Sequence, residues 1–340
     1  MTETIWTQLK QAGQPFFVLA PMDDVTDTVW REVVARAAAP DVMVTEFASS
    51  DGFTHPLGRE SVERRLKVNE TERRLGVPLI AQIWGANPDH YYEMARDLSA
   101  RGVFSGIDIN MGCPEKGIVK RGCCGGLIKQ ENWDTAAAII AATKAGAGEL
   151  PVSVKTRIGV GNVITEAWCG HLLQQEIAAL TIHGRTVREM SRVPAHWGEI
   201  AKVAALRDTL APETVIIGNG DVADRAHGEA LAAKHGTDGI MIGRGLFHNL
   251  FAFERQPCDH APEELSRILL EHLALYEQTW GNSKSYEPLK KFFKVYINGF
   301  PGAAELRAKL METKTPAEAR LVVTSHQQPP VTMPLASPVG

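Results

Sequence analysis

The stretch Asp108-Ile109-Asn110-Met111-Gly112-Cys113-Pro114 predicts a short buried strand that runs directly into a turn carrying a cysteine. Glycine permits close backbone approach and proline fixes φ, so this turn would hold Cys113 at a strand end rather than in a core. A structural cysteine in a glycine-rich loop is the alternative interpretation. The rest of the chain has to decide between a reactive and a structural thiol.

Similar short apolar runs recur along the chain, with room for one helix between neighbours. The runs cover residues 16–20, 42–47, 78–83, 106–110, 152–155, 179–183, 215–218 and 239–242. Helices are expected at 26–38, 88–101, 131–146, 163–177, 196–209 and 223–235, and a longer charged stretch, 59–74, is expected to hold another. Near-continuous apolar strands are typical of a parallel sheet buried on both faces.

Eight alternating β/α units predict a (β/α)8 barrel, the TIM barrel, with its active site at the C-terminal ends of the strands. An open doubly wound sheet needs fewer strands and a glycine-rich turn after the first strand, where this chain has Ala20-Pro21-Met22-Asp23. We expect the barrel to span residues 1–255, a smaller C-terminal helical domain to span 256–325, and a disordered tail to span 326–340.

Composition narrows the class of protein. The chain has 340 residues, 44% of them hydrophobic, and a net charge of −4, so any nucleic acid must be bound by a local basic patch. Its five cysteines form no Cys-x-x-Cys pair, which suits a reducing cytoplasm. The absence of a signal-like N-terminus and of a long apolar run argues against secretion and membrane insertion, and we expect a cytoplasmic monomer.

Polar or special residues follow all eight predicted strands. In chain order they are Pro21-Met22, Glu46, Gln82, Asn110 with Cys113, Lys155 with Arg157, His183 with Arg185, Asn219-Gly220-Asp221 and Gly243-Arg244-Gly245. Each alone could cap a strand or form a turn. Together, at the same end of one barrel, they predict one site.

The last two loops predict a phosphate site. Loops after strands seven and eight of such barrels commonly bind phosphate through backbone N–H groups. Gly218-Asn219-Gly220-Asp221 and Gly243-Arg244-Gly245 provide the glycines, and Arg244 can add a charge-assisted contact. The pair indicates a phosphorylated cofactor, although Asn-Gly-Asp alone is a common turn sequence.

Lys155 indicates which cofactor this is. A lysine at the end of a buried strand needs an anion, and the N1–C2=O edge of a flavin becomes negative on reduction. A Schiff-base lysine is the rival interpretation, but it leaves Cys113 without a role. His183 either contacts the flavin or its phosphate, or is a hydrogen-bonded structural histidine.

At this point the ordered motifs resemble the tRNA-dihydrouridine synthases. The resemblance runs from about residue 16 to 325 and rests on Ala20-Pro21-Met22, Val25-Thr26-Asp27, Thr45-Glu46, Asn110-Met111-Gly112-Cys113-Pro114, Lys155-Thr156-Arg157-Ile158-Gly159, His183-Gly184-Arg185-Thr186, Asn219-Gly220-Asp221 and Gly243-Arg244-Gly245. It implies a barrel containing FMN and a helical domain that together hold tRNA while one uridine is reduced at its C5=C6 bond, with NADPH as electron source.

The resemblance also implies roles for single residues. Positions around the flavin ring correspond to Pro21, Met22, Gln82, Lys155 and His183. Positions of the phosphate site correspond to Asn219, Gly220, Asp221, Gly243 and Arg244. Asn110 and Arg157 correspond to positions that face the target base, and Cys113 corresponds to the catalytic acid.

The chain departs from the family pattern after this cysteine. A stretch usually rich in glycine and alanine reads Gly122-Cys123-Cys124-Gly125-Gly126. Either these cysteines pack the loop as small residues, or one of them is an auxiliary thiol.

Reduction of uridine explains why a cysteine suits this position. The ring takes a hydride at C6 and a proton at C5 on opposite faces. An unperturbed cysteine, with a pKa of about 8.5, is mostly protonated at neutral pH. No histidine lies near Cys113 in sequence to activate it, so a general acid is favoured over a nucleophile. The base must also leave its stack to enter the barrel mouth, where Asn110 and Arg157 could read it.

The C-terminal region provides the expected RNA contacts. Within 284–310 the cations Lys284, Lys290, Lys291, Lys294, Arg307 and Lys309 outnumber Glu287 and Glu305. We expect Lys290, Lys291 and Lys294 to contact phosphates, and Phe292 and Phe293 to pack in the core rather than stack on bases.

Three other functions each leave part of the sequence unexplained. A dihydroorotate dehydrogenase-like enzyme would leave the basic helical region without a role. A non-catalytic tRNA-binding protein would leave the flavin residues unexplained. A metal site built from Cys113, Cys123 and Cys124 has poor ligand spacing, and no metal is expected.

Overall fold

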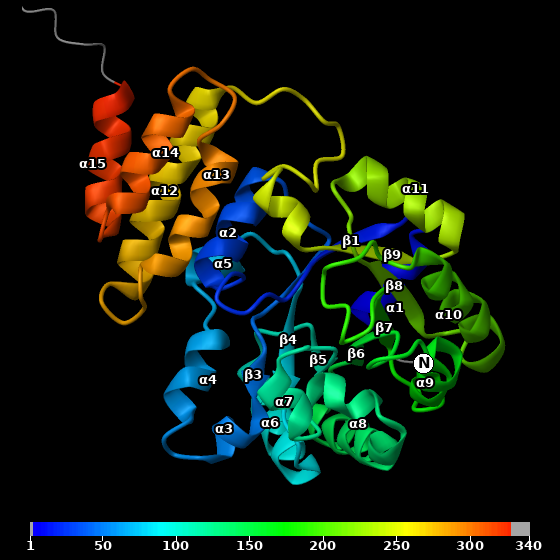
Figure 1. The fold of residues 1–340 in the computed structure, drawn as a ribbon. Coiled ribbons are helices and arrows are strands. Elements are labelled where there is room, and N and C mark those ends of the chain that lie inside the picture. The colour runs from blue at the N-terminus through cyan, green and yellow to red at the C-terminus, as the bar shows by residue number, and fades with distance from the viewer. Residues whose placement is uncertain (1–2, 328–340) are drawn as a thin grey trace, which may run out of the picture. The chain divides into compact units, whose positions relative to one another are not determined.

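The computed structural model describes residues 3–327, and in it eight parallel strands close into a barrel (Figure 1). The strands are β1 (Phe16–Leu19), β2 (Val42–Val44), β4 (Leu79–Trp84), β5 (Gly106–Met111), β6 (Val152–Arg157), β7 (Ala179–His183), β8 (Val215–Asn219) and β9 (Gly239–Ile242). They pair in chain order, and β1 pairs with both β2 and β9, which closes the ring. A short extra strand, β3 (Ala48–Ser49), pairs with the end of β4. The predicted TIM barrel is confirmed.

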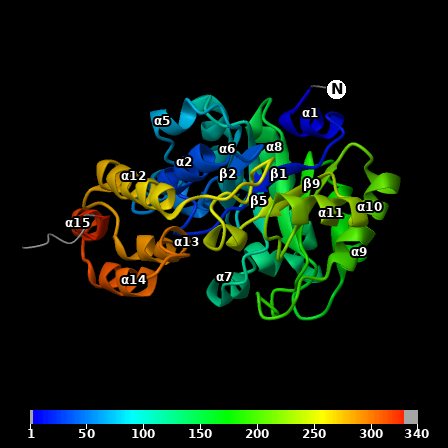
Figure 2. The same ribbon diagram turned by 90° about the horizontal axis from the view of Figure 1, so that it is seen from above.

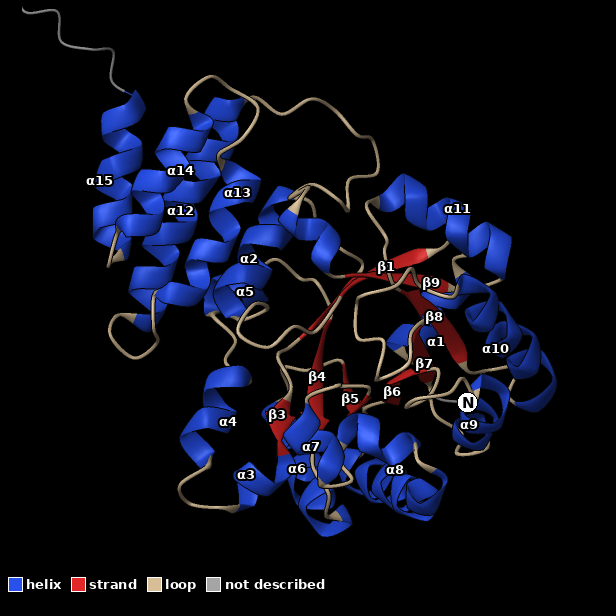
Figure 3. Cartoon of the chain, viewed as in Figure 1, coloured by secondary structure: helices blue, strands red, loops and turns tan. Residues whose placement is uncertain are grey.

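Helices surround the strands, as the colouring of Figure 3 makes plain. The predicted connections form α2 (Thr28–Ala37), α6 (Pro88–Arg101), α8 (Trp133–Ala147), α9 (Thr165–Leu173), α10 (Trp197–Leu210) and α11 (Arg225–His235). Both Figure 1 and Figure 2 show α9, α10 and α11 side by side outside the barrel. Gly102 ends α6 at φ 63°, a conformation that glycine adopts without strain.

The charged stretch 59–74 forms two short helices where one was predicted. They are α4 (Arg59–Arg65) and α5 (Glu70–Arg73), and α3 (Ser50–Thr54) precedes them. The helix breaks because the backbone N–H of Asn69 donates to Oγ1 of Thr28 on α2. Glu72 on α5 then accepts from Arg31 of α2 in a buried ion pair of 2.6 Å, which fixes α5 against α2.

Apolar side chains fill the barrel at the N-terminal ends of its strands. Phe16, Val18 and Ala20 alternate along β1 into this interior, where they meet residues of the other strands. Trp6 of α1 (Ile5–Gln11), a helix that was not predicted, packs on Phe16 with ring centroids 6.0 Å apart. The filled end leaves the opposite, C-terminal end of the barrel for a site.

Four shorter elements lie in the loops between the strands and helices of the barrel. They are α7 (Lys116–Lys120) and the 3-10 segments η1 (Cys124–Ile128), η2 (Gln130–Asn132) and η3 (Arg244–Phe247). Two of them, η1 and η3, follow the motifs Gly122-Cys123-Cys124 and Ile242-Gly243, so they lie close to the predicted site residues.

The chain divides into two compact units between Pro257 and Cys258, and the second unit is helical. Its described elements are α12 (Pro262–Trp280), η4 (Glu287–Phe292), α13 (Phe293–Tyr296), α14 (Ala303–Glu312) and α15 (Pro316–Gln327). Residues 326–327 of the expected tail belong to α15, and 328–340 lie outside the described residues. Among residues 3–327, no helix has both the length and the apolar content that a bilayer span requires.

Candidate active site

A cavity of about 690 Å³ opens at the C-terminal ends of the strands. Of the residues expected at the strand ends, all line it except Glu46, Gln82 and Arg185. The lining residues that were predicted are Pro21, Met22, Asn110, Cys113, Lys155, Arg157, His183, Asn219, Gly220, Asp221, Gly243, Arg244 and Gly245. The volume lies within the range of small-molecule and cofactor sites.

Strand register explains why these residues converge. Asn110 on β5 pairs with Lys155 on β6, and two residues further Arg157 pairs with His183 on β7. His183 in turn pairs with Asn219 on β8. Parallel strands in register therefore place one set of polar side chains around the barrel mouth.

Cys113 is held in a tightly bonded turn. The Oδ1 of Asn110 accepts hydrogen bonds from the backbone N–H groups of Gly112 and Cys113, both at 3.0 Å. The carbonyl of Cys113 accepts from Gly125 in η1 at 3.2 Å. Burial raises the pKa of the Cys113 thiol, while the positive charge of Arg157 opposes this rise. The thiol is therefore protonated at neutral pH.

Gln82 lies behind the cavity, which corrects its expected place on the cavity wall. It is fully buried on β4, where its Nε2 donates to Asp108 at 2.7 Å and its Oε1 accepts from Asn110 at 3.1 Å. The pairing of Gln82 with Asp108 in the sheet directs both side chains into the barrel. Gln82 thus reaches the site through Asn110.

Lys155 brings an unpaired positive charge into the cavity. Within residues 3–327, its Nζ has no hydrogen bond and no ion pair. Burial and the neighbouring charge of Arg157 together lower its pKa to about 8, against the opposing charge of Asp108. At neutral pH the side chain remains a cation in need of an anion.

His183 is a neutral imidazole. Its Nε2 lies 3.0 Å from Nη1 of Arg185, and because a guanidinium only donates, this nitrogen must accept. Burial, together with the charges of Arg157 and Lys155, lowers the pKa of His183 far below its ordinary value. The remaining proton is therefore on Nδ1, which makes that nitrogen a donor.

Arg157 donates most of its hydrogen bonds to backbone carbonyls of the neighbouring loops. Its Nε donates to the carbonyl of Gly112 at 2.7 Å, and its Nη1 donates to Thr186 and Met190. Its Nη2 has no hydrogen bond to any described residue. Arg157 therefore braces the cysteine turn and keeps one nitrogen for a ligand.

The glycine turns at strands β8 and β9 carry two arginines around one aspartate. Asp221 accepts from Arg185 and from the backbone of Ala195, and its other oxygen lies 3.3 Å from Arg244. Gly220 has φ 129°, and a Cβ there would lie 2.6 Å from that of Ala195. The Asp221 carboxylate thus orients two cations, and the turn between them has no room for a side chain at Gly220.

Several cavity residues were not predicted. Phe47, Met190 and Phe247 line it, and none of them belongs to a motif with a chemical signature. Arg185 was predicted at the end of its strand, but spacing in the sequence could not predict its ion pair with Asp221. The partly buried Phe47 also borders a second cavity of about 520 Å³, lined by Trp84, Arg65 and again Cys113.

Cys123 and Cys124 lie inside the loop that follows the Cys113 turn. Both are buried, and burial raises the pKa of each thiol. Cys124 has φ 48°, the left-handed region where glycine is usual, so a cysteine there carries local backbone strain. Within the described residues, these two sulfurs and that of Cys113 do not converge as a set of metal ligands.

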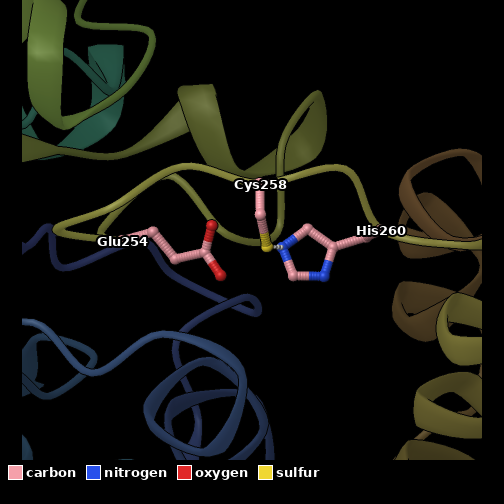
Figure 4. Close-up of side chains that lie close together, drawn as sticks. All are labelled: Glu254, Cys258 and His260. Atoms are coloured by element: carbon pink, nitrogen blue, oxygen red, sulfur yellow. Dashed lines mark hydrogen bonds between the residues drawn. The ribbon is translucent and has the colours of Figure 1, made fainter.

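Cys258, at the start of the second unit, is the exposed cysteine of the chain. Its Sγ lies 3.6 Å from Nε2 of His260 (Figure 4), whose Nδ1 lies 3.0 Å from Glu264. Because this thiol is accessible, thiol-labelling experiments on Cys113 require a background in which Cys258 is replaced.

In the second unit, only part of the expected basic face reaches solvent. Lys290 is buried, its Nζ donating to the carbonyl of Met311 at 3.0 Å and pairing with Glu287 at 2.9 Å. This corrects its expected phosphate contact, whereas Lys291 and Lys294 are exposed. Phe292 and Phe293 are buried, as expected for core residues.

Comparison with known proteins places the chain in one family. A model of the dihydrouridine synthase (Dus) family matches residues 18–329. The chain is 48% identical over 329 residues to a probable tRNA-dihydrouridine synthase of Staphylococcus epidermidis, covering 96% of this chain and 97% of that protein. It is 46% identical over 330 residues to probable tRNA-dihydrouridine synthase 2 of Bacillus subtilis, covering 96% and 98%.

Solved structures share the fold at low identity. Morphinone reductase in complex with tetrahydroNAD has a TM-score of 0.50 at 12% identity, covering 71% of this chain and 85% of that one. The old yellow enzyme from Trypanosoma cruzi also has a TM-score of 0.50, at 11% identity, covering 79% and 94%. At these identities the likeness concerns the barrel alone.

Proposed function

The chain belongs to the dihydrouridine synthase family, and on that premise we propose that it reduces the C5=C6 bond of one uridine in tRNA, using bound FMN and electrons from NADPH. This activity would make it a flavin-dependent oxidoreductase that acts on RNA. The free thiols and the tRNA substrate favour the cytoplasm as its compartment.

The cavity residues fit a flavin mononucleotide. The unpaired ammonium of Lys155 suits the N1–C2=O edge of the ring, and the Nδ1–H of His183 is a free donor beside it. The glycine turn at Gly220, which has no side chain, and the guanidinium of Arg244, whose side chain is 55% exposed, suit the phosphate. An anion at that end would share Arg244 with Asp221.

When bound and reduced, the flavin supplies the hydride that uracil accepts at C6. The chain must then provide a proton at C5 from the opposite face. Cys113 meets this requirement because its thiol stays protonated at neutral pH and its turn is fixed by Asn110. The Sγ–H gives its proton to C5, and the thiolate that remains is stabilised by the charge of Arg157.

Two groups are placed to hold the base. The free Nη2 of Arg157 is a donor that suits a uracil carbonyl oxygen, and Asn110 keeps one amide hydrogen beyond its bond to Gln82. A base can reach them only after leaving its stack, because the cavity lies within the barrel mouth.

The helical second unit is the proposed binding surface for the tRNA backbone. The exposed Lys291 and Lys294 would each neutralise a backbone phosphate, so binding would weaken as salt rises. Because Lys290 donates to the carbonyl of Met311 and pairs with Glu287, it stabilises the helical unit rather than binding RNA.

The observation that carries this proposal is the thiol of Cys113 lining one cavity with the unpaired Lys155. The test is to express the chain in bacteria that lack their own dihydrouridine synthases and to measure dihydrouridine in their tRNA by mass spectrometry. We expect dihydrouridine at one position with the wild type and with Cys123→Ala, and a severe loss with Cys113→Ala. Purified wild-type protein should be yellow, and a colourless protein that cannot be reconstituted with FMN would refute the flavin assignment.

A further inference from the structure

A buried carboxylic acid lies beneath the site and has no part in the chemistry above. Asp108 is 5% exposed and lies on β5, two residues before Asn110, so both side chains point into the barrel. Register pairs it with Gln82 on β4 and with Ser153 on β6. A leucine at this position would avoid the desolvation that a carboxylate suffers there.

A continuous chain of hydrogen bonds leads from Asp108 to the catalytic turn. Ser153 donates to its Oδ1 and Gln82 Nε2 donates to its Oδ2, both at 2.7 Å. Asn110 Nδ2 donates to Gln82 Oε1 at 3.1 Å, and Asn110 Oδ1 accepts from the backbone N–H of Cys113 at 3.0 Å. The acid is thus two side chains away from the turn.

The direction of this chain is fixed at both ends. An ionised carboxylate only accepts, so the amide nitrogen of Gln82 must face Asp108 and its oxygen must face Asn110. At the other end, the N–H groups of Gly112 and Cys113 only donate, so the oxygen of Asn110 must face them. Turning either amide by 180° would set donor against donor inside the barrel.

We propose that Asp108 is a positioning residue, which holds the Gly112–Cys113 turn in place through the amides of Gln82 and Asn110. Its effect on turnover rests on the proposed function, but its effect on the turn does not. Without the carboxylate, Gln82 has no fixed orientation and Asn110 is oriented by the turn alone, so the two N–H groups of the turn lose their acceptor for part of the time.

The charge state of Asp108 agrees with this role near neutral pH. Burial raises its pKa to about 6, against the hydrogen bonds from Gln82 and Ser153 and the charge of Lys155. Above that pH the group is ionised and can only accept. The nearby ammonium of Lys155 favours this form, so two groups that are each unfavourable to bury stabilise one another's charge.

The proposal predicts a local loosening that an ordinary core defect would not give. In Asp108→Leu a slightly larger apolar side chain replaces the carboxylate. In Asp108→Asn one oxygen remains to accept from Gln82, while the new amide nitrogen can donate to Ser153. We expect amide hydrogen exchange at Gly112 and Cys113 to quicken about tenfold in Asp108→Leu, the factor of one typical hydrogen bond, and Asp108→Asn to restore most of the protection.

The exchange is measured on purified protein without tRNA, so it does not depend on any activity. In the same variants, kcat for dihydrouridine formation should fall about tenfold with leucine, and the KM for tRNA should stay within about twofold. If the wild type makes no dihydrouridine, the proposed function fails, and the exchange still decides the role of Asp108.

A double-mutant cycle provides the decisive result. Asn110→Ala cuts the chain between Asp108 and the turn, so Asp108→Leu should add little further exchange in that background. Should Asp108→Leu fail to fold, Gln82→Leu interrupts the same chain one step later and should quicken the same two amides. Wild-type exchange at Gly112 and Cys113 in the folded single variants, or effects that multiply in the double variant, would overturn the proposal.

Discussion

Replacing Lys155 by methionine should make the apoprotein more stable and the flavin complex weaker. The lysine is a cation with no partner in the cavity, and burial lowers its pKa from 10.5 to about 8. A pKa difference of about 2.5 corresponds to about 3.4 kcal/mol, which partial solvent access reduces to roughly 2–3 kcal/mol. Methionine keeps the length of the side chain and removes the charge.

The sign of the effect follows from proton binding. Below pH 8 the lysine is protonated in both the folded and the unfolded chain, so the folded state bears the full penalty. Between pH 8 and 10.5 the folded lysine loses its proton first, and the wild type should regain stability that Lys155→Met already has. The two stability curves should therefore converge as the pH rises.

The assay is urea unfolding of flavin-free protein at pH 7 and pH 9.5, followed by fluorescence titration with FMN. At pH 7 the variant should be more stable than the wild type by about 2–3 kcal/mol, and its affinity for FMN should fall roughly 10- to 100-fold, as for a lost charge-assisted hydrogen bond. Lys234→Met, an exposed lysine on α11, is the matched control and should change neither quantity. A variant that gains no stability, or that binds FMN as the wild type does, would show that Lys155 does not face an anion.

Three further changes separate the parts of the site. Cys113→Ala should keep the flavin but slow dihydrouridine formation by roughly 10²–10⁴-fold in single-turnover assays with unmodified tRNA, and a rate close to wild type would remove this thiol from the mechanism. Arg244→Ala should release FMN on dialysis with an affinity roughly 10-fold or more below wild type, and unchanged retention would place the phosphate elsewhere. Lys291→Ala combined with Lys294→Ala should reduce the slope of log Kd for tRNA against log salt by about 1.5, whereas Lys290→Ala should instead lower the melting temperature because it removes a buried side chain and its hydrogen bond to the carbonyl of Met311.

The fold could be predicted because hydrophobic patterning records it directly. The run 179–183 and the helix 88–101 were predicted to the residue, since each is an unbroken apolar or amphipathic segment with clear ends. The stretch 59–74 was predicted as one helix and forms two, because its break depends on Thr28, which is distant in sequence.

The site could be predicted as a set of residues but not as a set of contacts. Spacing placed Asn110 and Gln82 at strand ends, but it could not show that the Asn110 amide lines the cavity while the Gln82 amide lies behind it. The charge count around Lys290 indicated a basic face, yet burial depends on which carbonyl the chain brings to the ammonium, and Met311 is 21 residues away. Partners chosen by tertiary packing leave no local pattern.

The position of Cys113 between two cavities has a consequence for its chemical survival. Because Cys113 lines the cavity beside Trp84 and Arg65 as well as the cavity at the barrel mouth, a cofactor seated in the barrel covers only one side of this residue. Peroxides and alkylating agents can therefore reach the sulfur of the resting enzyme. What spares it is low nucleophilicity: burial keeps the proton on the sulfur, and only the thiolate reacts quickly. The property that suits the residue to the proposed role of proton donor is thus also its defence against oxidation, and in that mechanism the sulfur is exposed to damage mainly in the interval after it has given its proton away.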